Sequence, residues 1–101
     1  MMNFQADGFD WDEGNWPKCA KHGLSKPEIE YALRHDPLVL MDRTARAAEQ
    51  RFNAVGRNRE GRHLFIVFTV RVINAAVLIR PVSARYMHER EVKTYEKTKK
   101  A

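Results

Sequence analysis

IRPVSARYMH, residues 79–88, is the stretch of the sequence that says most about the fold. The residues around its start, from Ala75 to Val82, favour a β-strand, and Pro81 indicates an edge or a bend because proline lacks a ladder donor. Ser83 suits a helix N-cap, since its hydroxyl can accept a hydrogen bond from a free amide of the first helical turn. The stretch therefore predicts a strand followed directly by a final helix over residues 84–99.

Two arginines flank the predicted start of that helix. Guanidinium forks on either side of free backbone amides suit a phosphate, so Arg80 and Arg85 are candidate phosphate ligands. Arg80 alternates with the apolar Leu78 and Val82, so it requires an anionic partner. That partner is either a phosphate or a carboxylate, from Glu49 or from the acidic N-terminal segment.

The charge is spread unevenly along the 101 residues, and the formal net charge is +5. Residues 1–16 carry only acidic charges, whereas the chain from Arg43 onward is rich in arginine and lysine. A basic second half indicates a polyanion or an acidic protein as partner, although a solvated surface would show the same composition. The length predicts a single domain over residues 1–101, with an open groove rather than a deep cavity.

The sequence also bears on the compartment in which the protein works. Cys19 is the only cysteine, so an internal disulfide is excluded and a reducing compartment is expected. No basic-then-apolar signal segment opens the sequence, and the apolar run Leu64–Val70 is too short to span a bilayer. We expect a cytoplasmic protein.

The N-terminal half predicts two helices. A short extended piece at residues 9–12 leads into a first, irregular helix that Asp12 caps and Gly23 ends. Ser25 and Glu28 have the spacing of a capping box, which predicts a second helix that ends at residues 36–37.

The remainder predicts an antiparallel sheet and the last helix. The expected strands cover residues 38–41, 49–56, 62–70 and 75–82, with a loop at 42–48. In the strand at 49–56, Phe52, Ala54 and Gly56 should share one face. The fold class is therefore α+β, with two N-terminal helices packed on a small antiparallel sheet and a C-terminal helix.

Several residues have the chemistry that metal-free RNA cleavage requires. Such cleavage needs a base for the 2′-hydroxyl, an acid for the leaving 5′-oxygen and cations on the phosphorane oxygens. Glu49 and Arg51 share a strand face, so Glu49 is a candidate base and Arg51 a candidate phosphate ligand. An exposed ion pair between the two is the alternative. His63, Arg85 and Tyr86 are candidates for the acid.

Other kinds of site find little support. Cys19 and His22 have helical spacing, but structural zinc requires four ligands and no second pair exists, so no metal or other cofactor is expected. No phosphate-binding loop, serine-hydrolase elbow or nicotinamide fingerprint is present.

A series of motifs resembles the BrnT toxins of bacterial type II toxin–antitoxin systems. In order along the sequence they are WD at 11–12, KHG at 21–23, DP at 36–37, ExRFxxVGR at 49–57 and IRPVSAR at 79–85. The resemblance covers about residues 9–97. It departs from the family in the first helix, where Trp16 and Pro17 interrupt a stretch that is usually regular, and in the connection at 70–74.

The resemblance implies a RelE-like domain that cleaves RNA, arrests translation and growth, and is neutralised by a DNA-binding antitoxin. Catalytic roles would fall to Glu49, Arg51, His63, Arg80 and Arg85, and RNA-binding roles to Lys21, Arg57, Arg62, Ser83 and Tyr86. The expected partner is a ribbon-helix-helix antitoxin similar to BrnA, in a complex of two toxins and two antitoxins that alone contacts operator DNA. The alternative function is a basic adaptor without catalytic activity that binds nucleic acid or an acidic protein.

Overall fold

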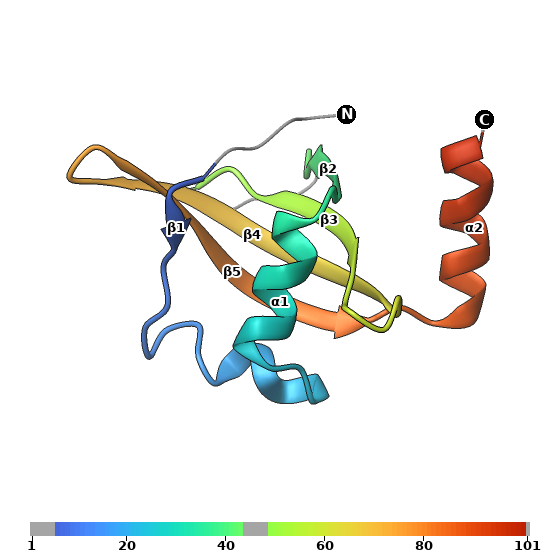
Figure 1. Cartoon of the computed structure of the whole chain (residues 1–101). Coiled ribbons are helices and arrows are strands. Elements are labelled where there is room, and N and C mark those ends of the chain that lie inside the picture. The colour runs from blue at the N-terminus through green and yellow to red at the C-terminus, as the bar shows by residue number, and fades with distance from the viewer. Residues whose placement is uncertain (1–5, 44–48, 101) are drawn as a thin grey trace.

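The computed structural model describes residues 6–43 and 49–100, in which a five-stranded sheet carries two α-helices and one 3-10 helix (Figure 1). In chain order the elements are β1 (Gly8–Phe9), the 3-10 helix η1 (Lys18–His22), α1 (Lys26–Arg34), β2 (Leu38–Met41), β3 (Phe52–Arg57), β4 (His63–Ile73), β5 (Ala76–Tyr86) and α2 (Glu89–Lys100). The strand order is β1-β5-β4-β3-β2. The expected α+β class is confirmed.

The sheet is mixed rather than purely antiparallel. β2 to β5 pair antiparallel, as expected, but β1 pairs with β5 in parallel, with Gly8 opposite Leu78. The sequence indicated only a short extended piece here, because a pairing across the whole chain leaves no local signal. Among the described residues, no helix is long and apolar enough to cross a membrane.

The core lies between α1 and one face of the sheet, which we call the helix face. α1 runs across the front of the sheet in Figure 1 and packs on β3 and β4. Ile29 of α1 and Ile66 and Phe68 of β4 are completely buried there. Each such side chain contributes about 1.5–3 kcal/mol through its burial. As predicted, Ala54 and Gly56 lie on this face of β3.

α1 begins where the capping residue predicts. Ser25 is the N-cap, and its Oγ accepts a hydrogen bond from the backbone amide of Glu28 at 3.2 Å. The Glu28 carboxylate interacts with the backbone amide of Ser25, as a capping box predicts, and it also binds Tyr86 and Asn58. The acidic side chain at the start of α1 therefore has contacts beyond the helix cap.

The predicted junction after Val82 is wrong. β5 continues through Ser83 and Arg85 to Tyr86, and α2 begins only at Glu89. β4 is long enough to pair with this whole segment, and Leu64 lies opposite Tyr86. A continuous ladder of backbone hydrogen bonds prevails over the local N-cap signal of a single serine. Arg80 and Arg85 therefore do not flank a helix N-terminus.

A β-bulge in β5 sets the direction of its side chains. The register shifts between Val67 and Phe68, whose partners are Ser83 and Pro81, so Val82 is the extra residue. The sequence predicted that Pro81 marks either an edge or a bend. The bend is confirmed, and the edge is wrong because β5 lies between β1 and β4. Arg80 pairs with Thr69 and Arg85 pairs with Phe65, and these two β4 residues are four positions apart, so they lie on the same face of β4. Because cross-strand partners share a face, both arginines lie on the face opposite α1.

The first predicted helix is a turn followed by η1. The side chain of Asp12 accepts a hydrogen bond from the amide of Gly14 at 2.7 Å, which is an Asx turn rather than a helix cap. Asn15 is buried, and its Nδ2 donates to the carbonyl oxygens of Asp10 and Pro81, both at 2.9 Å. This side-chain amide ties the N-terminal segment to β5 beyond the end of β1.

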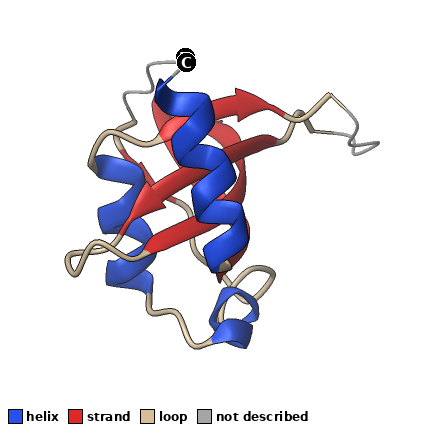
Figure 2. Cartoon of the chain, turned by 90° about the vertical axis from the view of Figure 1, so that its right-hand side faces the viewer, coloured by secondary structure: helices blue, strands red, loops and turns tan. Residues whose placement is uncertain are grey.

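α2 stands apart at one end of the sheet and crosses in front of it when the molecule is viewed from that end (Figure 2). Its attachments include the ion pair of Glu91 with Arg85 and an edge contact between the rings of Tyr95 and His63. The helix therefore depends on a few polar and aromatic contacts rather than on the apolar core.

Candidate functional site

The structure divides the predicted site residues between the two ends of the sheet. Strand pairing places Arg57 opposite His63, and Arg85 and Tyr86 opposite their β4 neighbours at the same end. With Arg62, these residues lie at the end of the sheet where β3 turns into β4, and we call them the hairpin-end group. Glu49, Arg51 and Arg80 lie toward the other end and form the β1-end group. The ten site residues predicted from the sequence therefore do not form one site.

Two predicted RNA-binding residues belong to neither group. Ser83 lies exposed on β5 between the two ends of the sheet. Lys21 lies in η1, but its side chain is outside the part of the chain that the structure describes.

The arginine of the β1-end group is already paired with carboxylates. The two guanidinium nitrogens of Arg80 contact the Asp12 carboxylate at 2.9 and 2.8 Å, and one of them contacts Asp10 at 3.3 Å. The hydrogen bond from Arg80 lowers the pKa of Asp12, and the same bond raises the pKa of Arg80. Of the alternatives left open for Arg80, the acidic N-terminal segment is therefore its observed partner.

Glu49 belongs to the same charged network. Its carboxylate contacts Arg71 at 3.3 Å, and Arg71 also contacts Asp10 at 3.4 Å. The expected alternative partner, Arg51, is not the residue that holds it. Arg71, which the sequence reasoning missed, thus links two carboxylates on the face opposite α1.

Arg85 is held by α2. Its two guanidinium nitrogens contact the two oxygens of Glu91 at 2.8 and 2.9 Å, and the guanidinium lies 5.0 Å from the centre of the Phe65 ring. The hydrogen bonds from Arg85, with one from the His88 amide, lower the pKa of Glu91 to about 2. Arg85 can bind a phosphate only after Glu91 leaves.

An open pocket of about 570 Å³ lies at the hairpin end, on the helix face. It is formed by the start of α1, the turn between β3 and β4, and the last residue of β5. Its lining residues are Ser25, Pro27, Glu28, Tyr31, Asn58, Arg59, Glu60, Arg62 and Tyr86. Two of the predicted RNA-binding residues, Arg62 and Tyr86, are among them.

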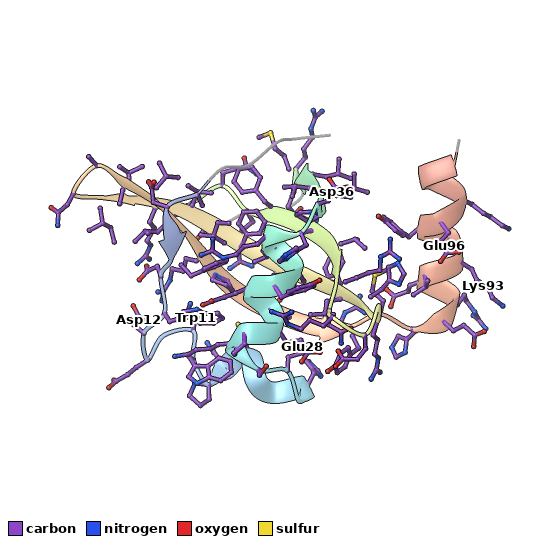
Figure 3. The ribbon with its side chains drawn as sticks, viewed as in Figure 1. Trp11, Asp12, Glu28, Asp36, Lys93 and Glu96 are labelled. Atoms are coloured by element: carbon purple, nitrogen blue, oxygen red, sulfur yellow. The ribbon has the colours of Figure 1, made fainter. Side chains whose placement is uncertain are left out.

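A carboxylate and a phenol meet in this pocket. Tyr86 Oη donates to Glu28 Oε2 at 2.7 Å, and Asn58 Nδ2 donates to the same oxygen at 2.7 Å. Figure 3 shows Glu28 at the N-terminal end of α1, well away from Lys93 and Glu96 on α2. Asn58 is itself fixed, because its Oδ1 accepts from the amides of Glu60 and Arg62 and so closes the turn.

These contacts shift the pKa values of Glu28 and Tyr86 in opposite directions. Burial raises the pKa of Glu28, but hydrogen bonds from Asn58 and Tyr86, together with the charge of Arg62, outweigh it and lower that pKa overall. The hydrogen bond to Glu28 raises the pKa of Tyr86, and burial adds to the effect. At neutral pH the pocket therefore holds an ionised carboxylate next to a protonated phenol.

Two cations of this pocket have no carboxylate partner. The Arg62 guanidinium lies 3.6 Å from the centre of the Tyr86 ring, and that of Arg59 lies 4.6 Å from the Tyr31 ring. Within residues 6–43 and 49–100, neither guanidinium makes an ion pair within 4.0 Å. Stacked on aromatic rings, they stay available to an anion.

The sequence reasoning missed Glu28, Asn58 and Arg59. The Ser25–Glu28 spacing was fully accounted for by a helix cap, and Asn58 by a turn. Glu28 and Tyr86 are 58 positions apart, and their contact depends on the register of β4 with β5. Among the described residues, no cluster of three or more His, Cys, Asp or Glu side chains could hold a metal ion.

The comparison with protein families matches most of the chain to a known family. The family described as "Ribonuclease toxin, BrnT, of type II toxin-antitoxin system" matches residues 11–91, which include η1, α1, β2 to β5 and the start of α2. The comparison with curated proteins gave no match.

Proposed function

Because the chain belongs to the BrnT family of ribonuclease toxins of type II toxin–antitoxin systems, we propose that it is an endoribonuclease that cleaves RNA without a metal ion and thereby arrests translation and growth. The family match supports ribonuclease activity and a protein antitoxin in general terms. The cleavage chemistry, the position of the site and the identity of the partner are the parts that we propose.

The observation that carries the position of the site is the gathering of cations at the hairpin end. Arg57 is exposed, Arg62 lies over an aromatic ring, and neither has an ion-pair partner in the described part of the chain. At the β1 end, by contrast, three carboxylate contacts surround the guanidinium of Arg80. RNA phosphates are bound more readily by cations that need not first release a carboxylate.

The reaction that we propose is attack of a 2′-hydroxyl on the adjacent phosphorus. Arginines stabilise the phosphorane oxygens electrostatically, which is the part of the barrier that fixed cations lower most. Arg57 and Arg62 bind the RNA strand, and Arg85 can join them when α2 releases it. Catalytic roles for Glu49, Arg51, Arg80 and His63 stay predictions, and the ion pairs of Glu49 and Arg80 count against them.

The partner that we propose is an antitoxin of the ribbon-helix-helix type, similar to BrnA. It would cover the basic hairpin end and supply the contacts to operator DNA, since the described elements include no helix-turn-helix. We propose a complex of two toxins and two antitoxins, because such repressors are dimeric. We also propose a cytoplasmic location, as the sequence predicts.

The test combines growth with RNA cleavage. The chain is expressed with and without its partner, and the purified protein is incubated with RNA alone and in a cell-free translation reaction. Arg57→Ala combined with Arg62→Ala should abolish cleavage, whereas Arg34→Ala, which removes an arginine from the far end of α1, should retain it. Full cleavage by the double variant together with loss in Arg80→Ala would move the site to the β1 end. RNA binding without cleavage by the wild-type protein would favour the adaptor function.

A further inference from the structure

The pocket at the hairpin end contains the two groups that acid–base catalysis requires, joined by one hydrogen bond. Glu28 and Tyr86 come from α1 and from the end of β5, and the oxygens that meet are 2.7 Å apart. Two guanidinium groups without carboxylate partners, those of Arg59 and Arg62, line the same pocket. We propose that Glu28 is the general base and Tyr86 the general acid of RNA cleavage, an inference that rests on the proposed ribonuclease function.

The geometry leaves each group one position for the substrate. The side-chain hydrogen bonds to the Glu28 carboxylate, from Tyr86 and from Asn58, both reach Oε2, and no described side chain donates to Oε1. The backbone amide of Ser25 also hydrogen-bonds this carboxylate. Oε1 has a lone pair that can accept the proton of a 2′-hydroxyl. The Tyr86 hydroxyl then rotates away from Oε2 and gives its proton to a leaving oxygen on the side of the pocket where Arg62 lies.

The proton transfers balance over one turnover. Glu28 takes the 2′-hydroxyl proton as the 2′-oxygen forms its bond to phosphorus. The bond from phosphorus to the 5′-oxygen breaks, and Tyr86 gives its proton to that oxygen. The products are a 2′,3′-cyclic phosphate and a 5′-hydroxyl. The protonated oxygen of Glu28 then turns toward the Tyr86 phenolate and returns the proton to it, which restores both groups. No oxidant, reductant or other reactant is needed.

The surroundings fit both roles and suggest the substrate class. The lowered pKa of Glu28 keeps it ionised as a base, and the raised pKa of Tyr86 keeps it protonated as an acid. Arg59 and Arg62 supply positive charge for the phosphate. In-line attack requires a nucleotide that can leave helical geometry, and an open pocket on the surface admits a flexible strand, so the substrate is single-stranded RNA.

A purely structural role for the Glu28–Tyr86 contact makes a different prediction. The contact could serve only to fasten α1 to β5 and to the turn at Asn58. Glu28→Gln separates the two roles, because the glutamine side-chain oxygen still accepts both hydrogen bonds but cannot act as a base. Tyr86→Phe keeps the ring under Arg62 and removes only the phenolic hydroxyl group. Glu30→Gln is the matched control, since Glu30 lies on the same helix and its carboxylate also accepts a side-chain hydrogen bond, from Trp11.

The experiment measures kcat and KM for an unstructured oligoribonucleotide, both free and in a cell-free translation reaction, with a fully paired duplex as a second substrate. Glu28→Gln and Tyr86→Phe should each lower kcat by about 10²–10⁴-fold with little change in KM. The double variant should be no worse than the poorer single variant, because the two groups act as a unit. Glu30→Gln should match the wild type, and the duplex should resist cleavage. Circular dichroism establishes that every variant is folded.

The pH profile provides a readout that a structural role would not change. Wild-type cleavage should fall on acidification as Glu28 is protonated, and Glu28→Gln should lose this limb of the profile. If the wild type cleaves RNA and both folded variants cleave within about threefold of its rate, the assignment of Glu28 and Tyr86 is overturned and the ribonuclease function stands. If the wild type cleaves neither free nor translated RNA, the proposed function itself fails.

Discussion

Gly56 is a position where the sheet lies very close to the backbone of α1, and Gly56→Ala should destabilise the protein strongly. An added Cβ would lie 2.6 Å from the backbone oxygen of Ala32 and 3.1 Å from its Cβ. Because a backbone oxygen cannot rotate away, α1 must move outward by roughly 0.5–1 Å, which forfeits about a quarter to a half of the local dispersion attraction. Overpacking of this kind costs about 3 kcal/mol at the upper end of its usual range.

The opposing effect at Gly56 is small. Alanine restricts the unfolded chain and so stabilises by about 0.4–1 kcal/mol, which leaves a net loss of about 2 kcal/mol. For a domain of this size, that loss lowers the melting temperature by roughly 8–16 °C. Cleavage should fall as well, since Glu28 lies on the displaced helix.

Urea unfolding followed by circular dichroism measures the loss at Gly56, and Gly8→Ala is the matched control. A Cβ at Gly8 would lie 3.5 Å from Leu78 Cδ2, which is an ordinary contact. This variant should be as stable as the wild type, or more stable by about 0.4–1 kcal/mol. If Gly56→Ala unfolds within about 0.5 kcal/mol of the wild type, the close approach of α1 to β3 is refuted.

Four further outcomes are expected. The pKa of Glu91 is about 2 in the folded protein against an ordinary 4.5, so the contribution of its ion pair is complete above pH 4.5 and is lost as the pH falls toward 2. The protection factors of the α2 amides, which correct for the pH dependence of intrinsic exchange, should fall over that range in the wild type and should be low at every pH in Glu91→Gln; equal protection in both proteins would contradict the ion pair. Arg80→Ala should make residues 10–15 susceptible to limited proteolysis. The control Arg71→Ala, which keeps Arg80 and Asp12 paired, should leave them as resistant as in the wild type. Equal cleavage of the two variants would show that Arg80 does not hold the segment. Expression of the chain alone should arrest growth, and normal growth with soluble, partner-free protein would count against a toxin. The isolated chain should give no sequence-specific mobility shift with operator DNA at near-physiological salt, and a specific shift would favour the adaptor.

Local chemistry predicted the elements whose boundaries are set locally. Ser25 marked the start of α1, and the alternation from Phe52 to Gly56 gave the correct faces of β3. The sequence failed where distant segments decide. Ser83 has the character of an N-cap, yet pairing with β4 carries β5 past it, and nothing near Gly8 indicates a parallel partner some 70 positions away.

The candidate site was predictable in its residue types but not in its grouping. Arg62 and Tyr86 were identified as RNA-binding candidates, and both line the pocket. Arg80 was identified by its apolar neighbours as an arginine that requires an anion, and the anions proved to be Asp10 and Asp12. Glu28 was overlooked because one local role, the helix cap, already accounted for it. A residue that satisfies a local rule can still be free for chemistry.

The bulge at Val82 makes the layout of this protein depend on counting as well as on chemistry. A substitution at that position leaves the number of residues unchanged, so every later side chain of β5 keeps its side of the sheet. In a regular strand Arg80 and Arg85, five positions apart, would lie on opposite faces, and the extra residue is what puts them on one face. Removing that residue would place Pro81 next to Ser83, opposite Phe68 and Val67, so β5 could form a regular ladder in which Arg85 and Tyr86 keep their present faces. The chain should therefore accept many different residues at position 82, and even the loss of that residue, while the pocket and the anchor of α2 are retained together.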